Sequence, residues 1–145
     1  LAERLLSDII GLEWEFVHDE ACRWEHVMSE HVERKLLTIL SDPSTSPYGM
    51  PVPGLELLGY QAAKPAEVYP VAELPTGDYK VGRIGEPLQL DYQFLSQLRD
   101  LELLPGARVR LEAGETWFLV NKSSDEGIVL DAQLASHLFL SKIED

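Results

Sequence analysis

Prolines and glycines are so dense in the middle of this chain that no helix or strand of ordinary length can cross it. Six of the nine prolines fall between residues 43 and 70, and three glycines stand among them. Proline fixes φ and lacks an N–H donor, so regular structure must stop before this stretch and start again after it. We therefore expect a first domain over residues 1–60, a proline-rich linker over 61–72 and a second domain over 73–145.

The composition permits two small domains and limits the partners that they can bind directly. Of 145 residues, 45% are hydrophobic, which is enough for one or two small cores. The 25 acidic and 12 basic side chains give a formal net charge of −13, which argues against nucleic acid or an anionic membrane as a direct partner. No apolar run approaches the roughly 18 residues of a membrane span, so we expect a cytoplasmic protein. A single cysteine, Cys22, excludes an internal disulfide framework.

The first part of the chain is patterned as helices. Apolar residues at helical spacing predict a helix that is already under way at Leu1 and ends at Gly11. Because the chain begins in mid-helix and without Met, we expect that residues upstream have been removed. A second helix is predicted over 13–28, and Ser29 is placed to cap a short third helix that Pro43 closes.

The part after the linker is patterned as short strands. Apolar runs separated by turn residues predict strands at 78–84, 107–112, 116–121, 127–130 and 138–143. A helical stripe within 92–103 lies between the first two. Five strands and one helix in about 70 residues suggest a small, partly open β-barrel of SH3-like size. The expected fold class is therefore α + β, with an all-helical domain followed by a small barrel.

Side chains that can bind metal are concentrated in the second expected helix. At about 100° per residue, one helix face carries His18, Cys22, Glu25 and His26. Imidazole, thiolate and carboxylate at these spacings form a mixed set of nitrogen, sulfur and oxygen ligands. Such a set suits Fe(II), Co(II), Ni(II) or Zn(II) better than Mg or Ca.

The same pattern has a purely structural interpretation, which spacing does not exclude. Both histidines can be half-exposed helix residues, Cys22 a small core residue and Glu25 a solvated one. Cys22 and His26 could also form a thiolate pair for nucleophilic catalysis, yet the sequence shows no third orienting group and no oxyanion-type loop. We therefore expect no enzyme, and metal binding and plain packing stay open as alternatives.

Several stretches are specific enough to indicate a family. In the first 58 residues they are LAERLL at 1–6, VHDEACRWEHVMS at 17–29, SPYG at 46–49 and PVPGL at 51–55. Together they resemble the diphtheria toxin repressor and iron-dependent regulator family of metal-dependent transcriptional repressors. In the second domain, LLPGARV at 103–109 and IVL at 128–130 are similar to the SH3-like, FeoA-like domain that ends iron-type members.

The resemblance implies an activating metal site. Its ligands here are Cys22, Glu25 and His26, joined in the family by a Met from a preceding winged-helix DNA-binding domain. Fe(II) is the expected metal, because a Cys replaces a second carboxylate, and Mn(II), Co(II), Ni(II) and Zn(II) are the alternatives. A metal with ligands from two domains favours the conformation that joins them, so metal level is expected to control DNA binding.

The resemblance also implies an ancillary metal site with an anion beside it. Glu3 and His18 match two of its ligands, a His upstream of Leu1 is a third, and Glu86 and Gln89 fit a Glu-x-x-Gln pair from the SH3-like domain. Ser46 matches one of the anion-binding residues, whereas a Met occupies the place of the family's Asn.

Further implications concern partners. In the family the helical domain forms a homodimer, and the candidates for interface or core here are Trp14, Val17, Ala21, Trp24 and Val27. A DNA operator is reached only through the missing N-terminal domain. The proline-rich linker is a candidate ligand of the SH3-like domain in the same chain.

Two other functions compete with the repressor. The first is a metal-dependent hydrolase with a dinuclear site built from Glu3, His18, Cys22, Glu25 and His26, although the sequence shows no substrate-binding loop. The second is a peptide-binding module in which the barrel from about residue 73 onward docks a proline-rich segment.

Overall fold

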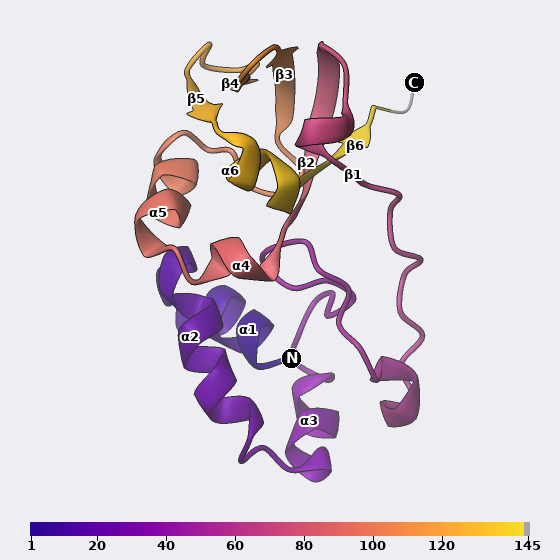
Figure 1. Ribbon diagram of the computed structural model, residues 1–145. Helices are drawn as coiled ribbons and strands as arrows, with labels where there is room; N and C mark the ends of the chain where they lie inside the picture. Colours follow the sequence, from indigo (N-terminus) through magenta and orange to yellow (C-terminus); the bar gives the residue numbers. More distant parts are fainter. Residues whose placement is uncertain (144–145) are drawn as a thin grey trace. The chain divides into compact units, whose positions relative to one another are not determined.

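The computed structural model describes residues 1–143 and divides the chain into two compact units. The first, Leu1–Pro65, contains helices and loops, and the second, from Ala66 onward, contains a six-stranded antiparallel sheet with helices (Figure 1). This confirms the α + β class. The boundary between the units falls inside the linker expected over 61–72. Among the helices of residues 1–143, none has the length and apolar character needed to cross a membrane.

The first helix of the chain is irregular. α1 (Ala2–Arg4) continues as a π-helix over Leu5–Ile10, and Gly11 ends it at the left-handed φ of 81°. The predicted end at Gly11 is confirmed, because glycine adopts this conformation without strain. A π-helix has wider turns than the α-helix that the apolar stripe predicts. Ile9 and Ile10 therefore leave the stripe and are 51% and 55% exposed.

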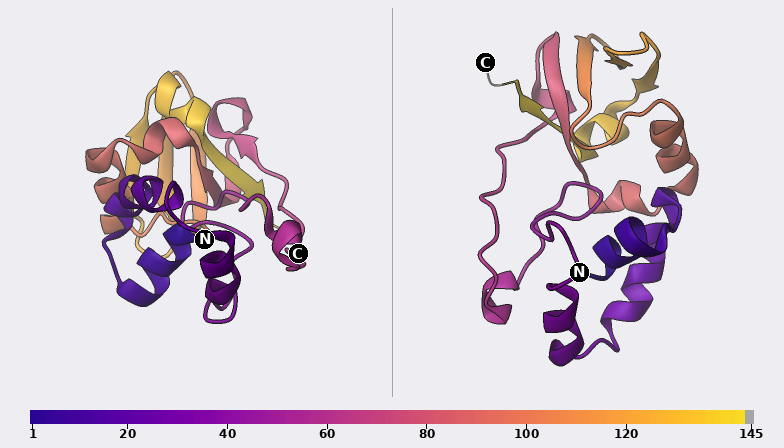
Figure 2. Two further views of the ribbon diagram at one scale, coloured as in Figure 1. Left: turned by 90° about the horizontal axis from the view of Figure 1, so that it is seen from below. Right: turned by 180° about the vertical axis from the view of Figure 1, so that it is seen from behind.

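The first unit also contains two longer α-helices and a 3-10 helix at Leu55–Leu58. α2 (Trp14–Glu25) packs against α1 (Figure 2), and it ends before the predicted residue 28 because His26 is already its C-cap. α3 (Glu30–Leu36) begins after Ser29, whose hydroxyl accepts the Val32 N–H at 3.2 Å. The predicted N-cap at Ser29 is therefore confirmed.

A packed turn follows α3 where the sequence is rich in prolines, and we call residues 44–51 the buried turn. A bridge between Thr45 and Pro51 closes it, and the Ser46 N–H donates to the Met50 carbonyl at 2.7 Å. Tyr48, at its centre, is fully buried. The breakers in this stretch thus shape an ordered part of the core.

Asp42 stabilises the entry to the buried turn in a pH-dependent way. Its pKa lies below the ordinary 3.8, first because the Ser44 N–H donates to Oδ1 at 3.0 Å, and then because of the Ser44 hydroxyl and the charge of Arg4. A pKa lowered by folding stabilises the fold above the unfolded-state pKa, and this stabilisation is lost as pH falls through the folded-state pKa. We expect Asp42→Ala to lower the free energy of unfolding more at pH 7 than at a pH below the ordinary pKa of 3.8. Urea denaturation at the two pH values measures this, and an equal loss at both would contradict it.

The second unit is built on the sheet order β1-β6-β2-β3-β4-β5 (Figure 1). Its strands are β1 (Tyr69–Pro70), β2 (Gly77–Ile84), β3 (Arg108–Ala113), β4 (Trp117–Asn121), β5 (Gly127–Leu130) and β6 (Leu138–Lys142). The structure contains all five strands that the apolar runs predict. In β3, for example, Val109 and Leu111 are fully buried and the residues between them are exposed.

Three α-helices and a 3-10 helix at Val71–Glu73 accompany the sheet. α5 (Tyr92–Asp100) matches the predicted helix and begins at Asp91, whose carboxylate accepts the Phe94 N–H at 3.0 Å. α4 (Glu86–Gln89) and α6 (Ala132–His137) were not predicted, because four and six residues are too few to show a helical period. α4 contacts both α5 and α6.

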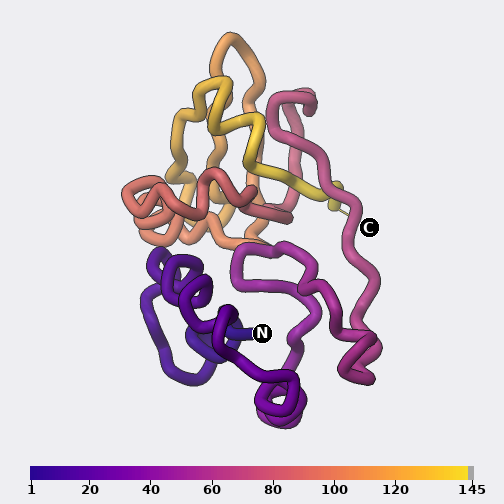
Figure 3. The backbone as a smooth tube through the Cα atoms, turned by 60° about the horizontal axis from the view of Figure 1, so that its bottom comes forward, coloured from indigo at the N-terminus to yellow at the C-terminus, as the bar shows by residue number. Residues whose placement is uncertain are grey.

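The end of the expected linker belongs to the sheet. Tyr69 and Pro70 of β1 pair with Leu140 and Phe139 of β6. The side chain of Val68 lies against Gly82 of β2. A Cβ added to Gly82 would be 2.6 Å from Val68 Cγ1. Before this, the chain runs from residue 60 to 68 without helix or strand (Figure 3).

Candidate metal centre

His18 is placed between two other predicted ligands. It lies in α2, and its Nδ1 is 3.9 Å from Glu3 Oε2, which the packing of α1 on α2 brings close. On the other side of the ring, Nε2 is 3.6 Å from the Sγ of Cys22, one helical turn further on. One imidazole therefore contacts a carboxylate from one helix and a thiol from its own.

The His18 side chain has the properties of a ligand held ready for a metal ion. Its side chain is only 16% exposed, and within residues 1–143 its buried Nδ1 has no hydrogen-bond partner. A buried polar atom without a partner is costly in a folded protein. Metal bonds of about 2.0–2.2 Å to nitrogen and oxygen would hold the two ligand atoms about 3–4 Å apart, as Nδ1 and Glu3 Oε2 are. The donor set of Glu3 and His18 thus fits a divalent metal.

The side chains of the other predicted ligands in α2 are not brought together around one point. Cys22, Glu25 and His26 are all exposed, with His26 at the C-cap of the helix. Over residues 1–143, no group of three or more His, Cys, Asp and Glu side chains lies close enough to hold a metal ion. Long exposed side chains adopt solvated rotamers, so the helix supplies the common face but does not by itself bring the donor atoms together.

Glu86 and Gln89 occupy one short helix of the second unit. They are three residues apart in α4. Glu86 is exposed, whereas Gln89 is 2% exposed and its Nε2 donates to the Ile84 carbonyl at 2.8 Å. This bond holds the amide inside the second unit, so the structure does not present Gln89 at the surface as the predicted metal ligand.

The predicted anion-binding Ser46 is part of the buried turn. It is 7% exposed, and its Oγ accepts the Tyr48 N–H at 3.2 Å. Arg4 fixes the same turn, since its Nε donates to the Thr45 carbonyl at 2.7 Å and its Nη2 to the Ser46 carbonyl at 3.3 Å.

Tyr48 is a residue of this region that the sequence did not point to. Its hydroxyl donates to the Trp14 carbonyl at 2.5 Å and accepts the His18 N–H at 3.1 Å. Its ring is 5.0 Å from the Trp14 ring and 6.2 Å from the His18 ring, centroid to centroid. The available signals were a large aromatic residue within a proline-rich segment and its place in the SPYG stretch at 46–49.

The residues predicted for interface or core separate into two groups. Val17 and Ala21 are buried in the core of the first unit. Val27 is 84% exposed, and Trp14 and Trp24 are half-buried with their indole N–H groups bonded to the Pro47 carbonyl and to Glu20. The same unit has further exposed apolar residues that were not interface candidates, namely Ile9, Ile10, Phe16, Val32, Ile39 and Leu57.

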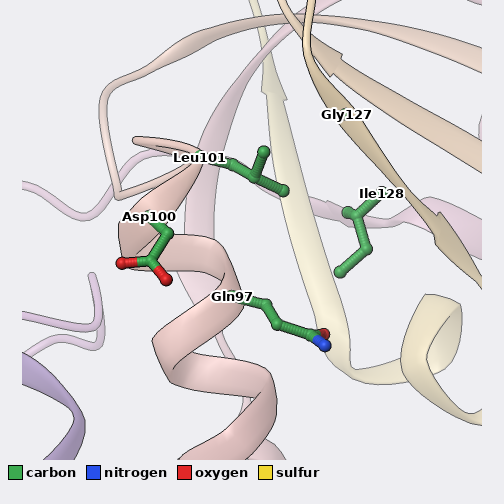
Figure 4. Close-up of a pocket in the computed structure, with 5 residues that line it drawn as sticks. All are labelled: Gln97, Asp100, Leu101, Gly127 and Ile128. Atoms are coloured by element: carbon green, nitrogen blue, oxygen red, sulfur yellow. The ribbon is translucent and has the colours of Figure 1, made fainter.

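An open cavity of about 330 Å³ lies in the second unit. Figure 4 shows its lining, which consists of Gln97, Asp100, Leu101, Gly127 and Ile128. None of the predicted metal ligands is among them, and one carboxylate and one amide are no metal site. The lining of the cavity therefore contains none of the residues on which the hydrolase alternative rests.

Comparison with known proteins gives matches over the whole chain. Residues 1–54 match the family model described as iron dependent repressor, metal binding and dimerisation domain. The iron-dependent repressor IdeR of Mycobacterium leprae is 42% identical over 152 residues, which cover 99% of this chain and 65% of that protein. The diphtheria toxin repressor of Corynebacterium glutamicum is 43% identical over 150 residues, covering 99% and 64%. The chain thus spans just under two thirds of the length of these relatives.

Solved structures share the fold. A manganese-dependent transcriptional repressor in complex with manganese superimposes with a TM-score of 0.82 at 24% identity, covering 98% of this chain and 66% of that one. The IdeR of T. acidophilum gives a TM-score of 0.78 at 24% identity, covering 98% and 63%.

Proposed function

The chain belongs to the iron-dependent repressor family, and on this premise we propose that it is the metal-sensing and dimer-forming part of a metal-dependent transcriptional repressor. The observation that carries the proposal is His18, whose buried Nδ1 faces Glu3 and whose Nε2 faces Cys22. The relatives named above are repressors, and operator DNA would be bound by a part of the protein outside this acidic chain. Such a regulator works in the cytoplasm.

Two metal sites follow from this proposal. Cys22, Glu25 and His26 would hold the activating metal, and Glu3 and His18 would hold the ancillary metal. The bound ion, Fe(II) first and Mn(II), Co(II), Ni(II) or Zn(II) otherwise, supplies a centre of positive charge that ligands from separate parts of the chain can share. The role of the chain's own residues is to present donor atoms from α1 and α2 and to keep the His18 ring fixed.

The anion and dimer proposals rest on the first unit. Ser46 would hold an anion through its hydroxyl, from a turn that Arg4 fixes. The homodimer would bury apolar side chains at the surface of the first unit, among them the exposed Ile9, Ile10, Phe16 and Val27 and the half-buried Trp24. Loss of this exposed apolar area on association supplies the driving force.

For the second unit we propose an SH3-like barrel that takes its own linker as a ligand. This proposal is supported by the pairing of Tyr69 and Pro70 with β6 and by the contact of Val68 with β2. Main-chain pairing of an extended segment at a sheet edge is a common mode of peptide recognition.

Metal titration tests the proposed function. In anaerobic calorimetry with Fe(II) and Co(II), we expect Cys22→Ala and His18→Ala each to lower metal affinity at least about 10-fold, because each removes a donor atom. Cys22 is exposed, so its substitution should leave the circular dichroism spectrum unchanged.

His31→Ala is the matched control, because His31 is an exposed histidine of α3 outside the predicted ligand set. Its metal affinity should equal that of the unmodified chain. If all three variants bind metal as the unmodified chain does, the two sites are not where we propose them. If His31→Ala weakens binding as strongly as His18→Ala, the metal is bound without site specificity.

A further inference from the structure

We propose that Tyr48 is the positioning residue of the metal site and that it couples the buried turn to His18. This inference deepens the proposed function and rests on it. Tyr48 has 0% of its surface exposed, and it comes from the turn at residues 44–51 and not from the helix that carries the ligands. It would touch no metal ion itself and would act through His18.

The hydroxyl of Tyr48 forms hydrogen bonds with two backbone groups of α2, a carbonyl and an N–H. It donates to the Trp14 carbonyl at 2.5 Å and accepts the His18 N–H at 3.1 Å. These groups are four residues apart, the spacing that an α-helix joins with its own hydrogen bonds. The backbone position of His18 therefore depends on a side chain that comes from outside the helix.

The Tyr48 ring also limits the rotation of the imidazole. The rings of Tyr48 and His18 meet edge to face, with an interplanar angle of 80°, and Trp14 packs on Tyr48 at 43°. Aromatic groups prefer such offset and edge-to-face contacts. The imidazole is thereby kept with Nδ1 toward Glu3 and Nε2 toward Cys22. Ligands whose ring orientation is fixed by neighbours bind metal more tightly than free ones.

Tyr48 is connected to the rest of the turn through its backbone. Its N–H donates to Ser46 Oγ at 3.2 Å, and the next residue back, Pro47, accepts the Trp14 indole N–H at 2.9 Å. A displacement of the turn therefore moves the phenol, and a displacement of the phenol moves the backbone of His18. The state of the turn and the metal affinity of His18 are thus linked, and by reciprocity metal binding would stabilise this arrangement of the turn.

Tyr48→Phe tests the inference, because it removes the hydroxyl and keeps the ring. In the Cys22→Ala background, which isolates the Glu3 and His18 site, we expect Co(II) affinity to fall about 10-fold in calorimetry. In the metal-free protein, we expect the NMR signals of the His18 ring to shift and broaden, while those of His31 stay unchanged.

Tyr79→Phe is the matched control. Tyr79 is 7% exposed, and its hydroxyl donates to the Pro75 carbonyl at 2.8 Å in the second unit, so this variant loses a comparable phenol bond. It should lower thermal stability similarly and leave Co(II) affinity and the His18 signals unchanged. Equal loss of affinity in both variants, or an unchanged His18 signal in Tyr48→Phe, would overturn the inference. If His18→Ala does not change Co(II) affinity, the proposed function fails, and the His18 signal of the metal-free protein still decides the role of Tyr48.

Discussion

Gly127→Ala is expected to destabilise the second unit by about 3 kcal/mol, although it adds a single methyl group. Gly127 begins β5 beside β4, and a Cβ built on it would clash with the Leu119 carbonyl oxygen and lie 3.0 Å from Val120 Cα. These are backbone atoms of a paired strand, so no side-chain rotation relieves the contact and the strands must separate. Thermal and urea unfolding of the purified chain measure the loss.

Gly114→Ala is the control for this substitution. A Cβ at Gly114 would be 3.5 Å from the Thr116 carbonyl, an ordinary contact, and its φ is not in the left-handed region. Its effect on the free energy of unfolding should stay within about 0.5 kcal/mol. Similar losses for the two glycines would show that the close approach of β4 and β5 is not what makes position 127 sensitive.

Asn121→Ala is expected to cost the second unit about 2–3 kcal/mol, because a buried amide satisfies three backbone groups. Asn121 is 4% exposed, and its Nδ2 donates to the carbonyls of Leu101 and Glu102 at 3.0 and 3.2 Å. Its Oδ1 accepts the Ser123 N–H at 2.9 Å. Glu102 has a φ of 55°, unusual for a residue with a side chain, and the amide supports the chain there. Urea unfolding compared with the unmodified chain gives the cost.

Asn121→Asp separates the donor from the acceptor. The carboxylate keeps the acceptor for Ser123 but faces two carbonyls with no proton to donate. At neutral pH we expect it to be at least as destabilising as Asn121→Ala. A variant as stable as the unmodified chain would mean that the bonds to Leu101 and Glu102 contribute nothing.

Much of the fold could be predicted because its signals are local. Gly11 and Ser29 mark helix ends by chemistry that involves only neighbouring residues, and the strands alternate along their own length. The π-helix after α1 and the strand β1 could not be predicted in this way. The first depends on how Leu5–Ile10 packs, and the second exists only because β6 offers an edge to Tyr69 and Pro70.

The candidate site likewise combines local contacts, which the sequence can predict, with long-range contacts, which it cannot. Helical spacing places Cys22 one turn from His18, and the two side chains meet at 3.6 Å. The approach of Glu3 depends on the packing of one helix on another, and the contact of Tyr48 with α2 spans 30 to 34 residues of sequence. Contacts of this range follow from the tertiary structure, which no periodicity in one segment encodes.

The two edges of the sheet, called its margins below, differ in sequence. This difference affects how readily the protein aggregates at high concentration. At one margin β1 ends in Pro70, and Lys142 of β6 lies 5.4 Å from the centre of the Tyr69 ring. At the other margin β5 has the sequence Gly-Ile-Val-Leu, without charge or proline, and Val129 is 59% exposed. Proline and lysine block the addition of a foreign strand, and an uncharged margin invites it. The net charge of −13 makes copies of the protein repel one another at low ionic strength. High salt screens this repulsion, and a pH near the sequence pI of 4.6 removes the net charge, so we expect the protein to aggregate most readily under these two conditions.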